Sequence, residues 1–252
     1  MPWIRALPAA LFLFAVTQPI RAQCALPAAE RVPQREGVPF QATEVIERTL
    51  PSGAWSTRGR MARNSAGSTF VEVIDPRSGT PAEMVILDVV HRRRIHLDPD
   101  RKEYSIVPLP ELRAQPLPLD WELTELRRAE EERDHSWHES VAGKDVVFRR
   151  LGKDRVSGLE AVGWMEERPL NSVAPSGTPA PEVCESWLSV DLGIPIRMMA
   201  RHRAAGEETE VHLTEILRVE PDPALFTIPE NYHPANGRRR RHARPLPADR
   251  GM

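Results

Sequence analysis

Two runs of alternating apolar and polar residues, at positions 194–201 and 208–219, constrain the fold of this chain most strongly. In the first run one parity holds Ile194, Ile196, Met198 and Ala200; in the second it holds Val211, Leu213, Leu217 and Val219. A period of two places alternate side chains on opposite faces, so the two runs predict an antiparallel hairpin with one buried face. On its outer face, opposite charges across the strands favour that register: Arg197, Arg201 and Arg203 against Glu208 and Glu210.

Upstream, short β-rich runs separated by turn residues recur about every ten residues, which is typical of an antiparallel sheet. They lie at 38–50, 55–63, 69–74, 84–90, 95–97, 104–107, 145–151 and 159–167. The most apolar of them, MVILDVV at 84–90, is predicted to lie near the centre of the sheet with both faces covered. No strand–helix alternation is present, so the residues predict an α+β fold that is mainly antiparallel β.

One segment favours a helix instead, at residues 120–134 (DWELTELRRAEEERD). Asp120 can cap it, Glu–Arg pairs support it, and a narrow apolar stripe is available from Trp121, Leu123 and Leu126. A highly charged helix of this length is marginal alone, so we expect it to lie against the sheet by that stripe.

The two ends of the chain differ from its body. Arg5 precedes an apolar run that is too short to span a bilayer, and the small residue Ala22 follows, so residues 1–22 are interpreted as a cleaved signal peptide. Residues 23–37 are expected to form a flexible leader, 38–232 a single β-rich domain, and 233–252 a disordered basic tail. The tail carries six Arg against one Asp from Gly237 onward, while the whole chain has a formal net charge of −2, so the body is acidic. The mature protein is therefore predicted to be periplasmic or secreted.

Two cysteines, Cys24 and Cys184, remain after such a cleavage. In an oxidising compartment an even pair suggests a disulfide, which would fix the new N-terminus. Two alternatives stay open: Cys184 as a small buried apolar residue with Cys24 as a loose thiol, or Cys24 as an acylated lipoprotein anchor. The lead-in Arg21-Ala22-Gln23 fits acylation poorly, because a lipobox has small residues there.

A resemblance to a known group supports this architecture. The order LGKDRVSGLEAVGW, a Pro/Gly loop, then CESWLSVDLGIPIRMMARHRAAGEETEVHLTEILRVEPDPALFTIPENY resembles secreted bacterial proteins of unknown function, and RMARNSAGSTFVEVIDP with VILDVVHRRRIHLDPDRKEY is similar to their N-terminal half. Their fold is like that of the periplasmic lipoprotein carriers (LolA-like) and the envelope-stress sensors. The resemblance implies a curved, incomplete β-barrel packed on one or a few helices, with an apolar concave face. It carries no catalytic residues.

Soft apolar side chains on the predicted strands are candidates for lining that concave face. They are Met84, Trp164, Met165, Ile196, Met198, Val211 and Leu213. The alternative is that the same residues form an ordinary core, because stripes at strand spacing usually do.

The residues give no pattern for catalysis. There is no G-x-S-x-G elbow and no phosphate-binding glycine loop. His135 and His138 stand beside Asp134 and Glu139, but zinc needs three or four ligands, and a solvated charged face is the simpler interpretation. We therefore expect no enzymatic activity, no metal and no cofactor. The tail around Arg240 fits peripheral contact with anionic lipid better than nucleic acid, because the chain is predicted to be secreted. The alternative, and the simpler interpretation, is a tail that only aids solubility.

These observations favour a non-catalytic binding protein for a lipid, an acyl chain or a lipoprotein segment. The alternative is a regulatory interaction module in which the sheet or helix 120–134 recognises a membrane-anchored envelope partner. A small metal-dependent hydrolase at His135 and His138 is a third hypothesis. The identity of ligand and partner, the oligomeric state and the role of the Arg-rich tail do not follow from the sequence.

Overall fold

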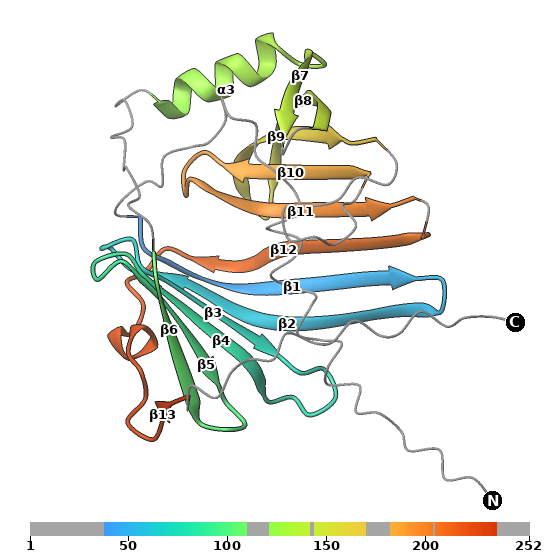
Figure 1. The fold of residues 1–252 in the computed structure, drawn as a ribbon. Coiled ribbons are helices and arrows are strands. Elements are labelled where there is room, and N and C mark those ends of the chain that lie inside the picture. The colour runs from blue at the N-terminus through green and yellow to red at the C-terminus, as the bar shows by residue number, and fades with distance from the viewer. Residues whose placement is uncertain (1–37, 110–120, 142–143, 170–181, 204, 236–252) are drawn as a thin grey trace, which may run out of the picture.

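The computed structural model describes residues 38–109, 121–141, 144–169, 182–203 and 205–235. They form one thirteen-stranded, curved and unclosed sheet in the order β13-β6-β5-β4-β3-β2-β1-β12-β11-β10-β9-β8-β7. All neighbours pair antiparallel except the short β13, which pairs parallel with β6. Figure 1 shows β7 to β12 and β1 stacked across the molecule, with β3 to β6 splayed to the lower left.

Most strands follow the chain through hairpins. The first half holds β1 (Phe40–Leu50), β2 (Gly53–Arg63), β3 (Thr69–Ile74), β4 (Pro81–Asp88), β5 (Arg93–Asp98) and β6 (Glu103–Pro108). The second half holds β7 (Ser136–Val141), β8 (Lys144–Val156), β9 (Leu159–Glu167), β10 (Val183–Ser189), β11 (Ile194–His202), β12 (Glu207–Leu217) and β13 (His233–Pro234). The halves join where β1 pairs with β12, which places β1 in the middle of the sheet.

The predicted hairpin is present as β11 and β12, with Arg201 opposite Glu208. The alternation of buried residues along β12 ends sooner than predicted, because Leu217 and Val219 are exposed. A register shift opposite Gln41–Thr43 and a positive φ of 51° at Glu215 break the alternation, so Ile216 turns toward the core instead.

Most of the apolar run at 84–90 lies in β4. The prediction that this run lies near the centre of the sheet was wrong. β4 lies fourth from the β13 edge, and Met84, Val85 and Leu87 are only half-buried. The central strand is β1, whose alternation of Ala42, Glu44 and Ile46 is less apolar in sequence but more completely buried.

The helix α3 (Trp121–Glu131) packs on β8 and β9, as the sequence predicted for this segment. Leu126 is half-buried in the contact, while Ala129, which the sequence analysis did not single out, is fully buried. The side chains of Trp121 and Leu123 lie outside the described residues. Among the described residues no helix is long and apolar enough to cross a membrane.

The C-terminal part of the fold includes a 3-10 helix, η2 (Pro223–Phe226), which contacts β3. Asp222 caps it by accepting a hydrogen bond from the Ala224 N–H at 2.9 Å. The chain then returns to the sheet as β13, whose His233 and Pro234 fall inside the segment predicted as a disordered tail. Residues 1–37 and 236–252, to which the signal, the leader and most of the basic tail were assigned, lie outside the described residues.

Candidate ligand-binding face

One row of directly paired residues crosses seven strands, from β8 to β2, on a single face of the sheet. We call the face that carries this row the inner face. The row reads Arg150, Trp164, Ser186, Met198, Val211, Ile46 and Thr57, and every member is at most 5% exposed. Because paired residues of neighbouring strands point to the same side, this register places the apolar members side by side. The centre of the row is a continuous apolar surface made by Met198, Val211 and Ile46.

The next row toward the β11–β12 turn is also buried. It contains Phe148, Glu166, Cys184, Ala200 and Thr209, each at most 7% exposed. Cys184 and Ala200 pack with Ile46, Met198 and Val211 in one cluster. Cys184 is disulfide-bonded. Its expected partner, Cys24, lies outside the described residues.

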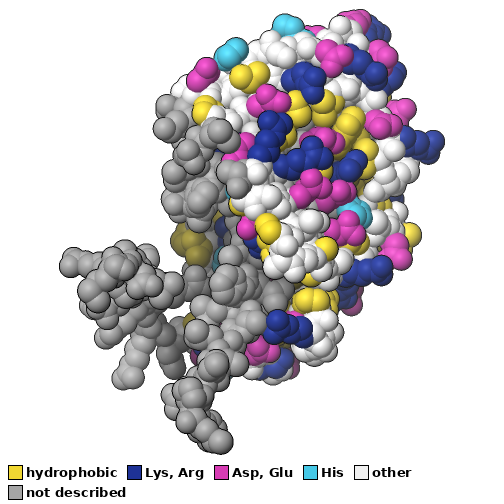
Figure 2. Space-filling model, turned by 90° about the vertical axis from the view of Figure 1, so that its right-hand side faces the viewer, with side chains coloured by type: hydrophobic (Ala, Val, Ile, Leu, Met, Phe, Trp, Pro, Cys, Tyr) yellow, Lys and Arg dark blue, Asp and Glu magenta, His cyan; other side chains and the backbone are white. Residues whose placement is uncertain are grey.

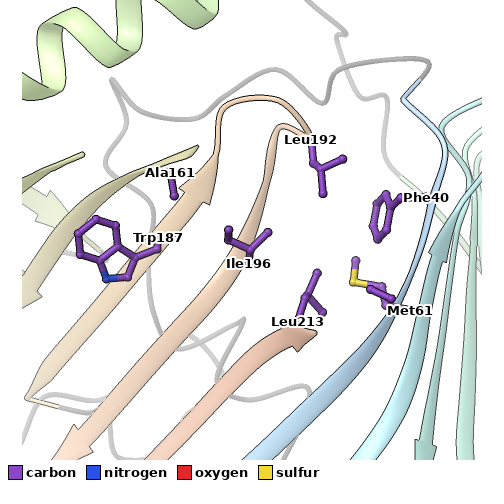
Figure 3. Packing of buried hydrophobic residues seen from close by; sticks show 8 residues of the cluster. Phe40, Met61, Ala161, Trp187, Leu192, Ile196 and Leu213 are labelled. Carbon is purple, nitrogen blue, oxygen red and sulfur yellow. The ribbon is translucent and has the colours of Figure 1, made fainter. Parts of the chain in front are cut away.

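At the opposite end of the strands the apolar surface continues between β1, β2 and the β10–β11 turn. Figure 3 shows Phe40 and Met61 on one side pointing toward Leu192, Ile196 and Leu213 on the other. These five side chains are at most 6% exposed. The inner face is therefore the concave side of the curve.

A buried arginine closes this end of the inner face. Arg63, 3% exposed, donates from Nε to the Val38 carbonyl at 3.0 Å and from Nη2 to the Leu192 carbonyl at 2.7 Å. Its guanidinium also lies 5.2 Å from the centre of the Phe40 ring. A guanidinium suits this position because it keeps its charge and donates in several directions at once. Arg63 thus joins the chain entering β1 to the β10–β11 turn.

Helix α3 covers the other margin of the inner face. Ala129 and Leu126 pack on Phe148, Val162 and Trp164. The same margin holds ion pairs between Arg150 and Glu132, at 3.3 Å, and between Arg168 and Glu166. Burying a charge is costly unless it is paired, so these partners let charged residues remain in an otherwise apolar wall.

One polar atom of the wall has no partner in the described part of the structure. The indole Nε1–H of Trp164 is buried and donates no hydrogen bond. Leaving such a donor unsatisfied costs roughly 1–3 kcal/mol, and natural structures seldom do so without a reason. An acceptor supplied by a bound molecule would remove this cost.

The structure brings together five of the seven residues that the sequence proposed for the concave face. Trp164, Met198, Val211 and Leu213 share the inner face by register, and Ile196, at a bulge between β10 and β11, packs in the same cluster as Leu213. Met84 and Met165 are not brought together with them. Met84 pairs with Leu97. Met165 pairs with Glu185, and because this pair is adjacent to the inner pair of Trp164 and Ser186, it lies on the opposite face of the sheet.

Sequence reasoning missed several contributors to the inner face, above all Ile46, Ala200 and Arg63. The alternation of Ala42, Glu44 and Ile46 was a usable signal for the first of these. Nothing in the sequence marks Arg63 as buried. It stands in an Arg-rich run with Arg58 and Arg60, and the pattern does not show which of these arginines is the most buried.

The opposite, outer face of β11 and β12 carries ion pairs between neighbouring strands. Arg197 contacts Glu210 at 2.9 Å and Arg201 contacts Glu208 at 2.6 Å, which confirms the predicted cross-strand pairs. The hydrogen bond that Arg197 donates to the Glu210 carboxylate raises the pKa of Arg197, against the smaller opposing effect of burial. On the side of the molecule shown in Figure 2, acidic and basic side chains are interspersed with small apolar areas, so that side has no large area of one charge.

The two histidines considered for metal binding have different partners. His135 stacks on Trp137 with ring centroids 6.1 Å apart, and His138 contacts Asp145 at 3.2 Å. Within the described ranges, no three residues among His, Cys, Asp and Glu are grouped so that they could hold a metal ion.

The fold and the inner face together define an unclosed antiparallel sheet with a buried apolar concave side. No family model and no curated protein matches the chain. Solved structures do match, including an uncharacterized conserved protein from Thermus thermophilus, which is 13% identical with a TM-score of 0.48. That match covers 82% of this chain and 95% of the other.

Two further matches concern the classes named by the sequence resemblance. The LolA superfamily protein NE2245 from Nitrosomonas europaea is 14% identical, with 81% of this chain and 98% of that chain covered and a TM-score of 0.34. MucB in the Pseudomonas aeruginosa MucA/MucB complex is 17% identical, with 79% and 57% covered and a TM-score of 0.40. The LolA superfamily and MucB are thus among the solved structures that the chain matches. At TM-scores below 0.5 these matches identify no ligand or partner for this chain.

Proposed function

We propose that this chain is a non-catalytic periplasmic or secreted binding protein that holds an apolar chain against its inner face. The ligand class is a lipid, an acyl chain or the lipid-modified segment of a lipoprotein, and the curved sheet acts as an incomplete barrel around it. The observation that carries the proposal is the row of seven buried cross-strand neighbours with Met198, Val211 and Ile46 at its centre.

The chemistry of the row favours a long, thin apolar ligand. An extended apolar surface across several strands suits an acyl chain, and methionine adapts to ligands of different length because its side chain is flexible and polarizable. The unpaired Trp164 indole N–H supports a ligand that also carries an acceptor, such as an ester or amide carbonyl. The polar groups of Arg150 and Ser186 flank that indole in the same row.

The direct test is oleate binding to protein from which bound lipid has been extracted, measured by calorimetry. Met198→Gln should weaken oleate binding about tenfold, since losing roughly 1.4 kcal/mol of apolar contact corresponds to that factor. Met199→Gln is the matched control, because Met199 is the next residue, is equally buried and pairs with Glu210 rather than Val211. Equal loss in both variants, or no oleate binding by the unaltered protein, would count against the proposal.

A second candidate function is supported by the edge of the sheet. β7 is the last strand in the order and pairs only with β8 among the described strands, so its other edge could accept a strand from an envelope partner. Crosslinking from an unnatural photoreactive residue at position 138, followed by mass spectrometry of periplasmic adducts, tests this alternative. A specific protein adduct together with absent oleate binding would favour the interaction module over the carrier.

A further inference from the structure

The inner face is less buried toward one edge of the sheet than in the middle. The two inner rows described above are at most 7% exposed. From Arg63 a further row of direct pairs continues over β3 to β6, through Thr69, Leu87, Arg94 and Val107. Thr69 and Leu87 are half-buried there, whereas Arg94 is exposed. Val107 is 50% exposed. The inner face therefore opens toward β6, and we call its part on β3 to β6 the open part.

Apolar side chains connect the open part to the buried part of the inner face. In the row next to Leu87, Val85 pairs with Val71, and Val71 pairs with Met61. Val71 also packs against the cluster that contains Met61 and Phe40. With about 4.8 Å between strands, the four steps from β5 to β1 cover about 19 Å on a flat sheet. This surface suits a ligand that is long, thin and apolar over most of its length.

The charged side chains of β4, β5 and β6 have ionic or imidazole partners, with one exception. The pairs are Asp88 with Arg93 at 2.9 Å, Glu83 with His96 at 3.7 Å, Asp98 with Arg101 at 3.8 Å, and Glu103 with His233 at 3.8 Å. The exception is Arg94, whose guanidinium has no ion pair with any residue that the structure describes. The register places Arg94 between Leu87 and Val107. A cation without a carboxylate thus stands in the open apolar row.

We propose that the open part is a second ligand subsite, which holds the head of a long-chain carboxylate at Arg94 and the adjoining part of its acyl chain on Leu87 and Val85. A guanidinium suits this head because its planar fork can donate two parallel hydrogen bonds to a carboxylate. The subsite rests on the proposed function only for the acyl class of the ligand, because it does not require the buried rows to open. A neutral lipid of the same length would leave Arg94 unpaired, so the subsite selects for charge.

A competition between two lipids of equal chain length tests the position of the head. Oleate and oleyl alcohol are offered together from cyclodextrin at mildly alkaline pH, and the lipids that the full protein retains are quantified by mass spectrometry. The unaltered protein should favour oleate about fivefold, the discrimination expected of one partly exposed charged contact. Arg94→Gln should bring the ratio near one. A ratio unchanged in Arg94→Gln would overturn the inference.

Arg101→Gln is the matched control, because it removes the same charge at the other end of β5 from a side chain that is 75% exposed. It should keep the preference for oleate, and an equal loss in this variant would show a general charge effect and also overturn the inference. The ratio does not depend on how much of each variant folds, since both lipids compete for the same protein.

Crosslinking tests the orientation of the ligand. A fatty acid with a diazirine beside its carboxylate should label peptides from β4 to β6, and one with a diazirine at its methyl end should label β1 or β2. Label from both probes on β10 to β12 alone would place the whole ligand in the buried rows and overturn the subsite.

Met198→Gln separates the subsite from the proposed function. If the buried rows also bind lipid, this variant should retain less of both lipids. Unchanged retention in Met198→Gln, with the oleate preference still lost in Arg94→Gln, would support the subsite and reject the buried rows. No retention of either lipid by the unaltered protein would reject both.

Discussion

Replacing Arg63 by methionine tests whether the entry to the inner face depends on one buried guanidinium. Methionine keeps most of the volume but donates no hydrogen bond, so the carbonyls of Val38 and Leu192 lose their donors at 3.0 and 2.7 Å. Each unsatisfied buried acceptor costs roughly 1–3 kcal/mol, and the contact with the Phe40 ring adds about 0.5–2 kcal/mol. Since removing a buried charge recovers part of its desolvation cost, we expect a net loss of about 3–5 kcal/mol.

Urea unfolding followed by circular dichroism measures this loss. With a slope of about 2 kcal/mol per molar, the midpoint should fall by roughly 1.5–2.5 M in Arg63→Met. Arg201→Met is the control, because Arg201 makes a 2.6 Å ion pair with Glu208 but is about two-fifths exposed, and such pairs contribute below about 1 kcal/mol. If the two variants lose similar stability, the buried guanidinium does not hold the entry strand, and the reasoning fails.

Two further substitutions test local features of the sheet. In Gly163→Ala the new Cβ would lie 2.7 Å from the ring of Trp187, so the ring must move, with an expected cost of about 1–3 kcal/mol and a changed near-ultraviolet circular dichroism spectrum; an unchanged spectrum would contradict the contact. For Asp88, burial alone would raise the pKa, but hydrogen bonds from His91 and Arg93 outweigh it and lower the pKa below 3.8. Its stabilising effect is therefore present above pH 3.8 and lost as the pH falls through the lowered pKa, so Asp88→Asn should be less stable at neutral pH and lose less urea resistance on acidification. Equal acid sensitivity in both proteins would refute this.

The strand pattern was predictable because period-two alternation and turn residues are local properties. The runs at 69–74 and 159–167 match β3 and β9, and the charge pairs of the β11–β12 hairpin were found from sequence alone. β7 was missed because SWHESV carries little apolar signal and follows the charged helix. β13 was missed because two residues at a sheet edge leave no periodic pattern.

The candidate site was predictable only in part, because alternation separates two faces without saying which is the inner one. Met198 and Met199 are both buried, at 5% and 6%, although they point to opposite sides. Met165, like Met199, has its sulfur against an arginine, Arg149, at 3.8 Å. Long charged side chains thus bury apolar residues on the outer face as well. The sequence pattern does not distinguish these outer residues from residues of the core.

Met84 shows a second reason why the candidate site was predictable only in part. Different segments of the chain cover the two halves of the sheet, and they cover opposite faces. On β2 to β5 the row Ala62, Phe70, Ile86 and Ile95 is at most 3% exposed, and it lies on the face opposite to Met61. Met84 shares that face and packs with Leu225, Phe226 and Tyr232 of the segment that carries η2. The C-terminal segment therefore buries the outer face of one half of the sheet, whereas α3 buries the inner face of the other. The inner side of β4 is only partly buried. The apolar run at 84–90 therefore reflects the packing of the C-terminal segment on the outer face, and it does not mark the buried rows of the candidate ligand face.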